Sequence, residues 1–169
     1  MRKKLIISVV VILLLIIFLF FAFSKEKASF RIYTYNPKTE TLTPEEVIIE
    51  VPRWEKVFSR DKILEKVLEK LIEVSSRNGE NFPIPKGTKL LGISVKNNIA
   101  YVNFSQELKR NHPGGSMGEM LTVYSIVDTL TEFPEVHKVQ ILIDSAVVET
   151  LVGHMDLTVP LERDLSLVQ

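Results

Sequence analysis

Apolar residues are concentrated at the start of the chain. From Leu5 to Phe23 there are 19 residues without a charge, and Ser8 is the only polar one among them. At about 1.5 Å per residue, such a helix measures about 28 Å, close to the thickness of a bilayer's hydrocarbon core. The pattern therefore predicts a transmembrane helix over residues 5–23, preceded by a short basic leader, residues 1–4.

This apolar segment could be kept as an anchor or removed as a signal peptide. Secretory signals usually have a shorter apolar run, about 7–15 residues, with small residues at the cleavage site. Ala22 and Ser24 would suit such a site, but Phe23 lies between them and the run is long. We favour a retained anchor, and cleavage stays open.

Basic residues lie on both sides of the predicted span: Arg2, Lys3 and Lys4 before it, and Lys25, Lys27 and Arg31 after it. Basic residues favour the cytoplasmic side of a membrane, and a four-residue leader is easily retained there. We expect a single-pass protein of the cell membrane with a cytoplasmic N-terminus and its C-terminal domain outside the cytoplasm. A cytoplasmic domain is the alternative.

Strand patterns follow the span. We expect the polar residues 24–29 to form a short linker that holds the folded part close to the bilayer. Residues 30–35 and residues 46–51 are rich in aromatic or β-branched side chains, which is typical of strands. Pro52 ends the second run.

Residues 60–75 show the periodicity of an amphipathic helix. Oppositely charged Lys and Glu residues three positions apart form its solvated side. Asn78-Gly79 suits a turn at its end. Six apolar residues recur at the spacing of a single stripe, namely Ile63, Leu64, Val67, Leu68, Leu71 and Ile72.

A hairpin and a second helix are expected next. Residues 89–95 and 99–104 are β-rich runs joined by Lys96-Asn97-Asn98, and Asn tolerates the positive φ of a tight turn. Ser116 and Glu119 then have the S-x-x-E spacing of a capping box at a helix start.

The second helix should run from Ser116 to about Thr131, since Pro134 prevents a much longer one. Its apolar residues cover more than one narrow stripe, so it is either buried over much of its circumference or meets a partner. We expect Leu121 and Ile126 to form an outer patch, the candidate partner surface. The side facing the sheet should comprise Met120, Val123, Tyr124, Val127 and Leu130.

Two more strands are expected at residues 138–143 and 147–151, joined by a turn at Asp144-Ser145-Ala146. The order β-β-α-β-β-α-β-β indicates an α+β domain over residues 30–163, followed by a tail, residues 164–169. The two helices should cover one face of a small mixed or antiparallel sheet.

Charge and composition narrow the function. Without residues 1–24 the chain has 18 basic and 21 acidic residues, a net charge of −3. Binding nucleic acid would require a basic face that neutralises phosphates, so we expect no nucleic-acid partner. The absence of cysteine excludes disulfides, Cys-ligated zinc and a lipid-modified cysteine.

No motif predicts a cofactor or a metal. Gly114-Gly115-Ser116 lacks the remaining residues of a phosphate-binding loop and is typical of a turn into a helix. His154 and Asp156 could supply two metal ligands, but the other histidines, His112 and His137, have no metal-site spacing.

No motif predicts catalysis either. Ser116 and Ser145 lie in no nucleophile motif. Glycosidase-like carboxylate pairs occur by chance in a domain with this many acids, here among Asp128, Glu132, Asp144 and Glu149.

Several motifs of the second half belong to one known pattern. They are Leu90-Leu91-Gly92-Ile93-Ser94-Val95, Ala100-Tyr101-Val102-Asn103-Phe104-Ser105, Gly114-Gly115-Ser116, Glu119, Thr131-Glu132-Phe133-Pro134, Ile143-Asp144 and Gly153-His154-x-Asp156. Together they resemble the GerMN domain of sporulation and spore germination, present here as a single copy. The family usually has Asp-Gly at the last hairpin turn, whereas Ser145 follows Asp144 here.

The resemblance implies a compact α+β module on an anchored extracytoplasmic protein, with no catalytic residue or cofactor to transfer. It gives the motif residues structural roles at a helix start, a helix end, a hairpin turn and a turn that binds the tail. These residues are Gly114, Gly115, Ser116 and Glu119; Glu132, Phe133 and Pro134; Asp144; and Gly153, His154 and Asp156.

We therefore expect a non-enzymatic assembly or interaction module in the bacterial envelope, of the sporulation or germination type or a non-sporulating counterpart. Its partner would be an envelope protein or a second copy. The alternative is a peptidoglycan- or carbohydrate-binding module with weak hydrolase activity. Trp54 is the only tryptophan, so an aromatic platform for sugars would be sparse.

Overall fold

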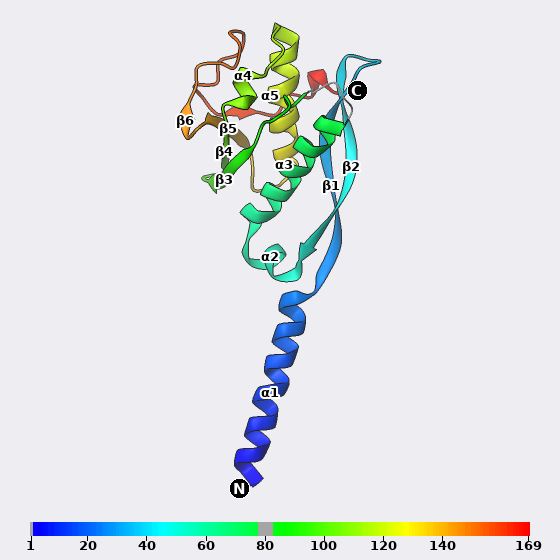
Figure 1. Ribbon diagram of the computed structural model, residues 1–169, viewed down its shortest axis with the longest axis vertical. Coiled ribbons are helices and arrows are strands. Elements are labelled where there is room, and N and C mark those ends of the chain that lie inside the picture. Colours follow the sequence, from blue (N-terminus) through cyan, green and yellow to red (C-terminus); the bar gives the residue numbers. More distant parts are fainter. Residues whose placement is uncertain (1, 78–82) are drawn as a thin grey trace.

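The structure is a computed structural model that describes residues 2–77 and 83–169. An apolar helix stands below a domain of mixed strands and helices (Figure 1). The expected α+β class is confirmed. The elements in chain order are α1 (Arg2–Phe23), β1 (Lys25–Asn36), β2 (Thr41–Pro52), α2 (Arg53–Phe58), α3 (Arg60–Arg77), β3 (Leu90–Lys96), β4 (Ile99–Phe104), α4 (Glu107–Arg110), α5 (Ser116–Leu130), β5 (Lys138–Ile143), β6 (Ala146–Val147), β7 (Leu161–Glu162) and the 3-10 turn η1 (Leu165–Leu167).

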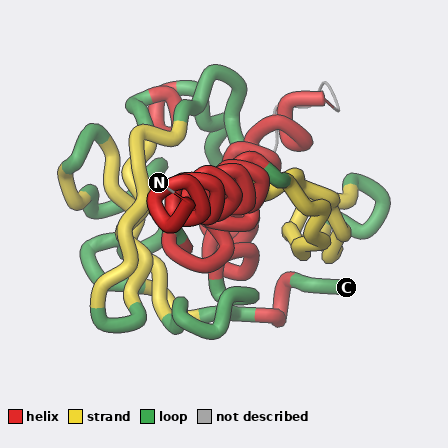
Figure 2. The backbone as a smooth tube through the Cα atoms, turned by 90° about the horizontal axis from the view of Figure 1, so that it is seen from below, coloured by secondary structure: helices red, strands yellow, loops and turns green. Residues whose placement is uncertain are grey.

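The strands form two sheets rather than the single sheet that we expected. β1 and β2 form an antiparallel two-stranded hairpin, while β3, β4, β5 and β6 lie side by side in a second sheet, with β7 paired to β5. β4 and β5 are parallel, because α4 and α5 form the crossover between them. The helices α3 and α5 lie between the hairpin and the larger sheet (Figures 1 and 2).

The position of α5 between two layers corrects the expected partner surface. Leu121 is 2 % exposed and Ile126 is fully buried. Leu121 lies in a cluster with Tyr33 and Leu42 of the hairpin, whereas Ile126 belongs to the main core. The broad apolar surface of α5 is therefore covered by the domain's own two sheets, and the outer patch that we expected on this helix is wrong.

The linker expected at residues 24–29 is also replaced by regular structure. β1 begins at Lys25, two residues after α1 ends, and Lys25 pairs with Pro52 of β2. A polar sequence can occupy this strand because alternate side chains point to solvent while its backbone groups bond to β2. The domain thus starts where the apolar helix stops.

The turns explain how the strands are joined. Asn97 and Asn98 both have positive φ, 50° and 62°, as expected for a tight turn between β3 and β4. Asp144 and Ser145 adopt the same region without glycine. Asn103 stabilises that turn, since its Oδ1 accepts the Ser145 amide at 2.7 Å.

Two helix and strand ends differ from expectation. α3 extends to Arg77, and the Asn78-Gly79 turn expected after it lies outside the described residues. Of the last expected strand, 147–151, only Val147 is in a strand, as the second residue of the two-residue β6. The remaining residues turn toward α5, for a reason given below.

Truncating Ile126 tests the burial of α5. Ile126→Ala should lower the free energy of unfolding by about 2–5 kcal/mol, because it leaves a cavity in the core. The measurement is urea unfolding of the full chain in detergent micelles, followed by Trp54 fluorescence.

Leu91→Ala is the matched control, since Leu91 is half exposed on β3 and its truncation should cost less than about 1 kcal/mol. Equal costs for the two variants would contradict the buried position of Ile126.

Candidate functional site

A buried carboxylate at the start of α5 holds a loop from the end of the domain. The Oε1 atom of Glu119 accepts the amides of Leu151 at 2.7 Å and Val152 at 3.1 Å, together with the Thr150 hydroxyl. Its Oε2 accepts the amide of His154 at 2.8 Å. These bonds hold residues 150–154 against α5, whereas β6 ends at Val147.

Glu119 is ionised in this setting. The side chain is fully buried, and burial raises its pKa. The hydrogen bonds from Thr150 and from the backbone of Val152, His154 and Leu151 outweigh burial, so the pKa of Glu119 lies below its ordinary value. The carboxylate thereby satisfies backbone N–H groups of the loop that would otherwise lack these hydrogen-bond partners.

The capping box expected at this helix start is therefore wrong. The N-cap is Gly115, which forms no side-chain cap, and Ser116 is an exposed first residue of α5. Gly114 and Gly115 both have positive φ, 91° and 84°, so the chain enters the helix through a backbone turn that favours glycine. Glu119 turns inward to the loop instead of back to its own helix.

His112 supports the same turn. Its Nδ1 accepts the Gly114 amide at 2.9 Å, and its Nε2 lies 3.0 Å from the Thr122 hydroxyl of α5. Burial lowers the pKa of His112, which favours the neutral ring that can accept this bond.

The remaining residues of the Gly-His-x-Asp motif line an open hollow of about 420 Å³ beside the loop. Gly153 has a φ of 104°, and the His154 side chain is exposed. Asp156 Oδ1 accepts the Thr158 amide at 2.9 Å, so this carboxylate closes a local turn. Among residues 2–77 and 83–169, no three His, Asp or Glu side chains form a cluster suited to a metal.

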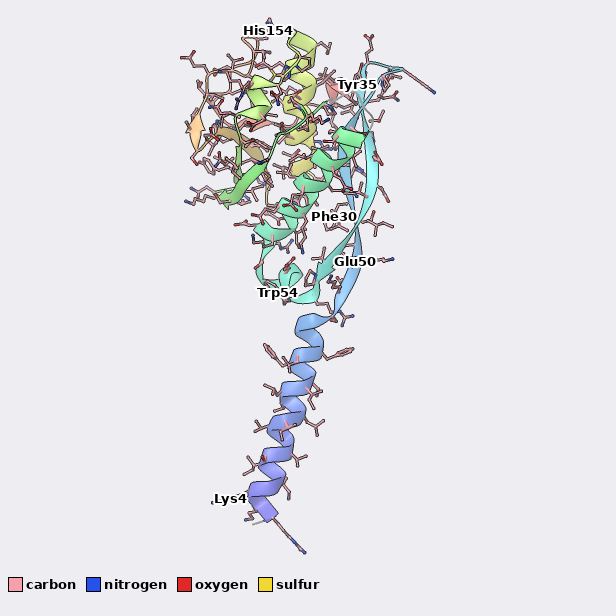
Figure 3. All side chains as sticks on the ribbon, viewed as in Figure 1. Lys4, Phe30, Tyr35, Glu50, Trp54 and His154 are labelled. Atoms are coloured by element: carbon pink, nitrogen blue, oxygen red, sulfur yellow. The ribbon has the colours of Figure 1, made fainter. Side chains whose placement is uncertain are left out.

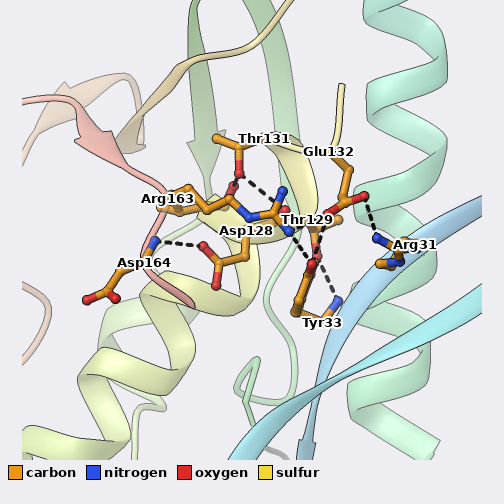
Figure 4. Close-up of polar contacts among 9 residues, drawn as sticks. Arg31, Tyr33, Asp128, Thr129, Thr131, Glu132, Arg163 and Asp164 are labelled. Carbon is orange, nitrogen blue, oxygen red and sulfur yellow. Dashed lines mark hydrogen bonds and ion pairs between the residues drawn. The ribbon is translucent and has the colours of Figure 1, made fainter. Parts of the chain in front are cut away.

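A second carboxylate, Glu132, joins three segments at the other end of α5 (Figure 4). Its Oε1 accepts from the Tyr33 hydroxyl at 2.8 Å and from Arg163, and its Oε2 accepts from Arg31 at 3.2 Å. Burial raises the pKa of Glu132, but the Arg163 and Tyr33 hydrogen bonds outweigh it and the pKa lies below its ordinary value. The cluster ties β1 and the segment after β7 to the end of α5.

Phe133 and Pro134 complete that helix end. The Phe133 ring stacks on Phe30 of β1, with centroids 5.7 Å apart and planes 23° from parallel. The residue after it, Pro134, is exposed. A shallow hollow of about 340 Å³ lies beside this stack, lined by Ser29, Phe30, Arg31, Glu46, Glu132 and Phe133.

Asp128, one turn before Glu132, is only partly satisfied. Its Oδ1 accepts the Asp164 amide at 3.2 Å, whereas its Oδ2 is buried without a hydrogen-bond partner among the described residues. Burial raises the pKa of Asp128 to about 6. In the sequence, the position of Asp128 among the apolar residues of α5 could have indicated that this acid is buried.

The candidate residues thus gather at the two ends of α5, apart from Asp144 at its hairpin turn. Glu119 meets the loop of Gly153 and His154, and Glu132 meets the hairpin. Every one of these contacts joins segments of the chain to one another. The chemistry that the geometry supports is structural ion pairing and hydrogen bonding.

Replacing Glu119 by Gln should lower the free energy of unfolding by about 1–3 kcal/mol, because the NH2 group that replaces one carboxylate oxygen cannot accept from the backbone N–H groups that face it. Ser116→Ala is the matched control on the same helix and should change it by less than about 0.5 kcal/mol. Chemical unfolding of both variants gives the comparison, and a larger cost for Ser116→Ala would restore the capping box.

Asp128 should make stability depend on pH in a defined direction. The pKa of Asp128 is higher in the folded state than in the unfolded state, so its protonated form favours folding. Its contribution to the free energy of unfolding is fully present below the unfolded-state pKa and is lost as the pH rises through about 6. The lowered pKa of His112 has the opposite effect, because protonation of this ring at lower pH reduces the free energy of unfolding.

The comparison with Asp128→Asn isolates the effect of the acid. Between pH 7 and pH 5 the wild type should gain about 1 kcal/mol relative to this variant. Unfolding curves at both pH values measure it, and parallel changes in the two proteins would show that Asp128 does not titrate there.

Three solved structures are similar to this fold. A presumed lipoprotein from Clostridium perfringens is 25 % identical, with a TM-score of 0.56 over 84 % of this chain and 90 % of that chain. The first GerMN domain of the sporulation protein GerM from Bacillus subtilis is 23 % identical, with a TM-score of 0.58. This match covers 80 % of this chain and 98 % of that domain. The tandem GerMN domains of GerM from Bacillus subtilis are 20 % identical, with a TM-score of 0.54. This match covers 83 % of this chain and 46 % of the tandem pair.

No curated protein matches the chain in sequence. The structural matches agree with a single copy of the domain, since this chain covers nearly all of one GerMN domain and less than half of a tandem pair. A family model for sporulation and spore germination matches residues 31–149. The resemblance seen in the motifs is thereby confirmed, and the chain belongs to the Germane, or GerMN, family.

Proposed function

We propose that this protein is held in the membrane by α1 and presents its GerMN domain outside the cytoplasm as a non-enzymatic interaction module of the bacterial envelope. The observation that carries the proposal is α1 itself. Residues 2–21 form a helix long and apolar enough to cross a bilayer, and none of it is buried by the domain. A signal sequence would share this length and composition, so retention is the point to test.

The junction of α1 with the domain supports retention. The amide of Arg53, at the start of α2, donates to the carbonyl of Ser24 at 3.1 Å. Cleavage near Ala22 or Ser24 would cut the chain directly beside β1, where no spare linker separates the helix from the first strand.

The Clostridium relative supports an envelope location, since it is described as a lipoprotein. The present chain contains no cysteine to carry a lipid. In our proposal α1 provides the attachment instead.

An interaction role is favoured over catalysis because the buried charged groups serve to join segments. Glu119 and Glu132 both accept from several donors within the fold, so neither is free to act as an acid or base. The rival carbohydrate-binding function gains little support, since neither of the two hollows described above is lined by Trp or Tyr. The partner in our proposal is a protein of the envelope or a second copy.

A charge in the middle of α1 tests the anchor. Leu14→Arg should cost about 2.5–3.5 kcal/mol of insertion free energy, so the fraction of protein resistant to alkaline extraction of membranes should fall sharply. Leu91→Arg, the same change on an exposed position of the domain, should leave extraction unchanged. A mature protein that begins at Lys25 would contradict the anchor.

The interaction role is tested with the full chain in its membrane. Residue-specific cross-linking should capture a protein or a second copy, and C-terminal reporter fusions should be active only outside the cytoplasm. Saturable retention on purified cell wall, with no protein cross-link, would support the rival function.

A further inference from the structure

The short helix α2 lies where the chain leaves the membrane. Since Ser24 directly follows α1 and its carbonyl accepts a hydrogen bond from the Arg53 amide, the first residue of α2 is one hydrogen bond from the end of the span. Figure 3 shows Trp54 at the end of the domain that faces α1, with Tyr35 and His154 toward the opposite end. A span that ends at the hydrocarbon boundary therefore brings α2 to the depth of the lipid headgroups.

The side chain of Trp54 on α2 suits that depth. Trp54 is 40 % exposed and is the only tryptophan of the chain. Tryptophan is enriched at membrane interfaces, since its ring is apolar while its N–H needs a polar partner. In water the ring would be a large exposed apolar group. In the headgroup layer the ring contacts lipid while its N–H reaches a polar partner.

The inner side of α2 is fixed to the domain. Glu55, the next residue, is 8 % exposed, and its carboxylate accepts a hydrogen bond from Lys66 of α3. α2 also contacts β2 and α1. A membrane contact through Trp54 would consequently restrain the whole domain and not a loose loop.

Two basic side chains at the junction, those of Lys25 and Arg53, have acidic partners. Lys25 lies 3.9 Å from Glu50, and Arg53 lies 3.6 Å from Glu26. Since paired charges attract anionic lipid weakly, the contact rests on the Trp54 ring and on chain continuity more than on lipid charge.

We propose that α2 lies in the headgroup layer, where Trp54 inserts at the membrane interface and holds the GerMN domain upright in one orientation. This inference rests on the proposed function, because it requires that α1 is retained as the span. The orientation leaves the end of the domain that carries His154 farthest from the membrane, and the hairpin turn between β1 and β2 also lies away from the membrane (Figures 1 and 3).

The single tryptophan makes the test direct. The full chain is reconstituted into phosphatidylcholine vesicles, with and without phosphatidylglycerol, that carry bromine near the headgroup end of the acyl chains. Trp54 fluorescence should fall about twofold relative to vesicles without bromine, as expected for an interfacial ring. The loss should be similar with and without the anionic lipid.

The control moves the reporter to the far end. Trp54→Phe combined with Lys38→Trp places the only tryptophan at the exposed hairpin turn, where the core is not disturbed, and its fluorescence should be unaffected by bromine. Alkaline extraction of the same vesicles reports on α1.

Two results would overturn the inference, and extraction distinguishes them. If the chain resists extraction but Trp54 is quenched no more than the control, α2 does not lie at the interface, whether it faces water or a second protein chain, while the anchor stands. If the chain is extracted, both the anchor and the inference fail.

Discussion

The helix α5 has to be covered over most of its circumference beyond its first turn, because apolar side chains occupy most of that surface and its burial is the main driving force of folding. One sheet can cover only one side of a helix. The domain meets this constraint with two layers, since the larger sheet lies on one side of the helices and the β1–β2 hairpin on the other. The separate hairpin is thus a consequence of the composition of α5.

Burial of α5 extends to its polar residues, and each of them needs a partner. Thr122 donates to the Pro83 carbonyl, Ser125 donates to the Thr122 carbonyl, and Thr129 accepts the amide of Tyr33. Glu119 takes up the amides of the last loop. The polar pattern of the helix therefore determines which distant segments dock on it, while Asp128 keeps one oxygen without a partner.

Periodicity and turn chemistry predicted the local structure of the domain well. The stripe in α3 and the Asn97-Asn98 turn are properties of neighbouring residues, and both were found as expected. Long-range partners were harder. Ser116 and Glu119 have the spacing of a capping box, but Glu119 binds amides more than 30 residues away, and no local pattern encodes where those amides lie.

The same limit applied to the candidate partner surface. Leu121 was expected outside because one sheet was assumed, and its exposure depends on a hairpin whose place in space is a tertiary property. The linker at residues 24–29 was assigned from its polar side chains, whereas its structure comes from backbone pairing with the end of β2. Family motifs located the important residues, but their physical roles came from the contacts.

The contact between Tyr33 and Arg163 joins residues 130 positions apart. Almost the entire chain has to be synthesised before this contact can form, since β1 is made early and Arg163 near the end. Until then the hairpin side of α5 lacks its polar contact with the end of the chain. The domain therefore completes its folding late, after nearly all of its residues have left the ribosome.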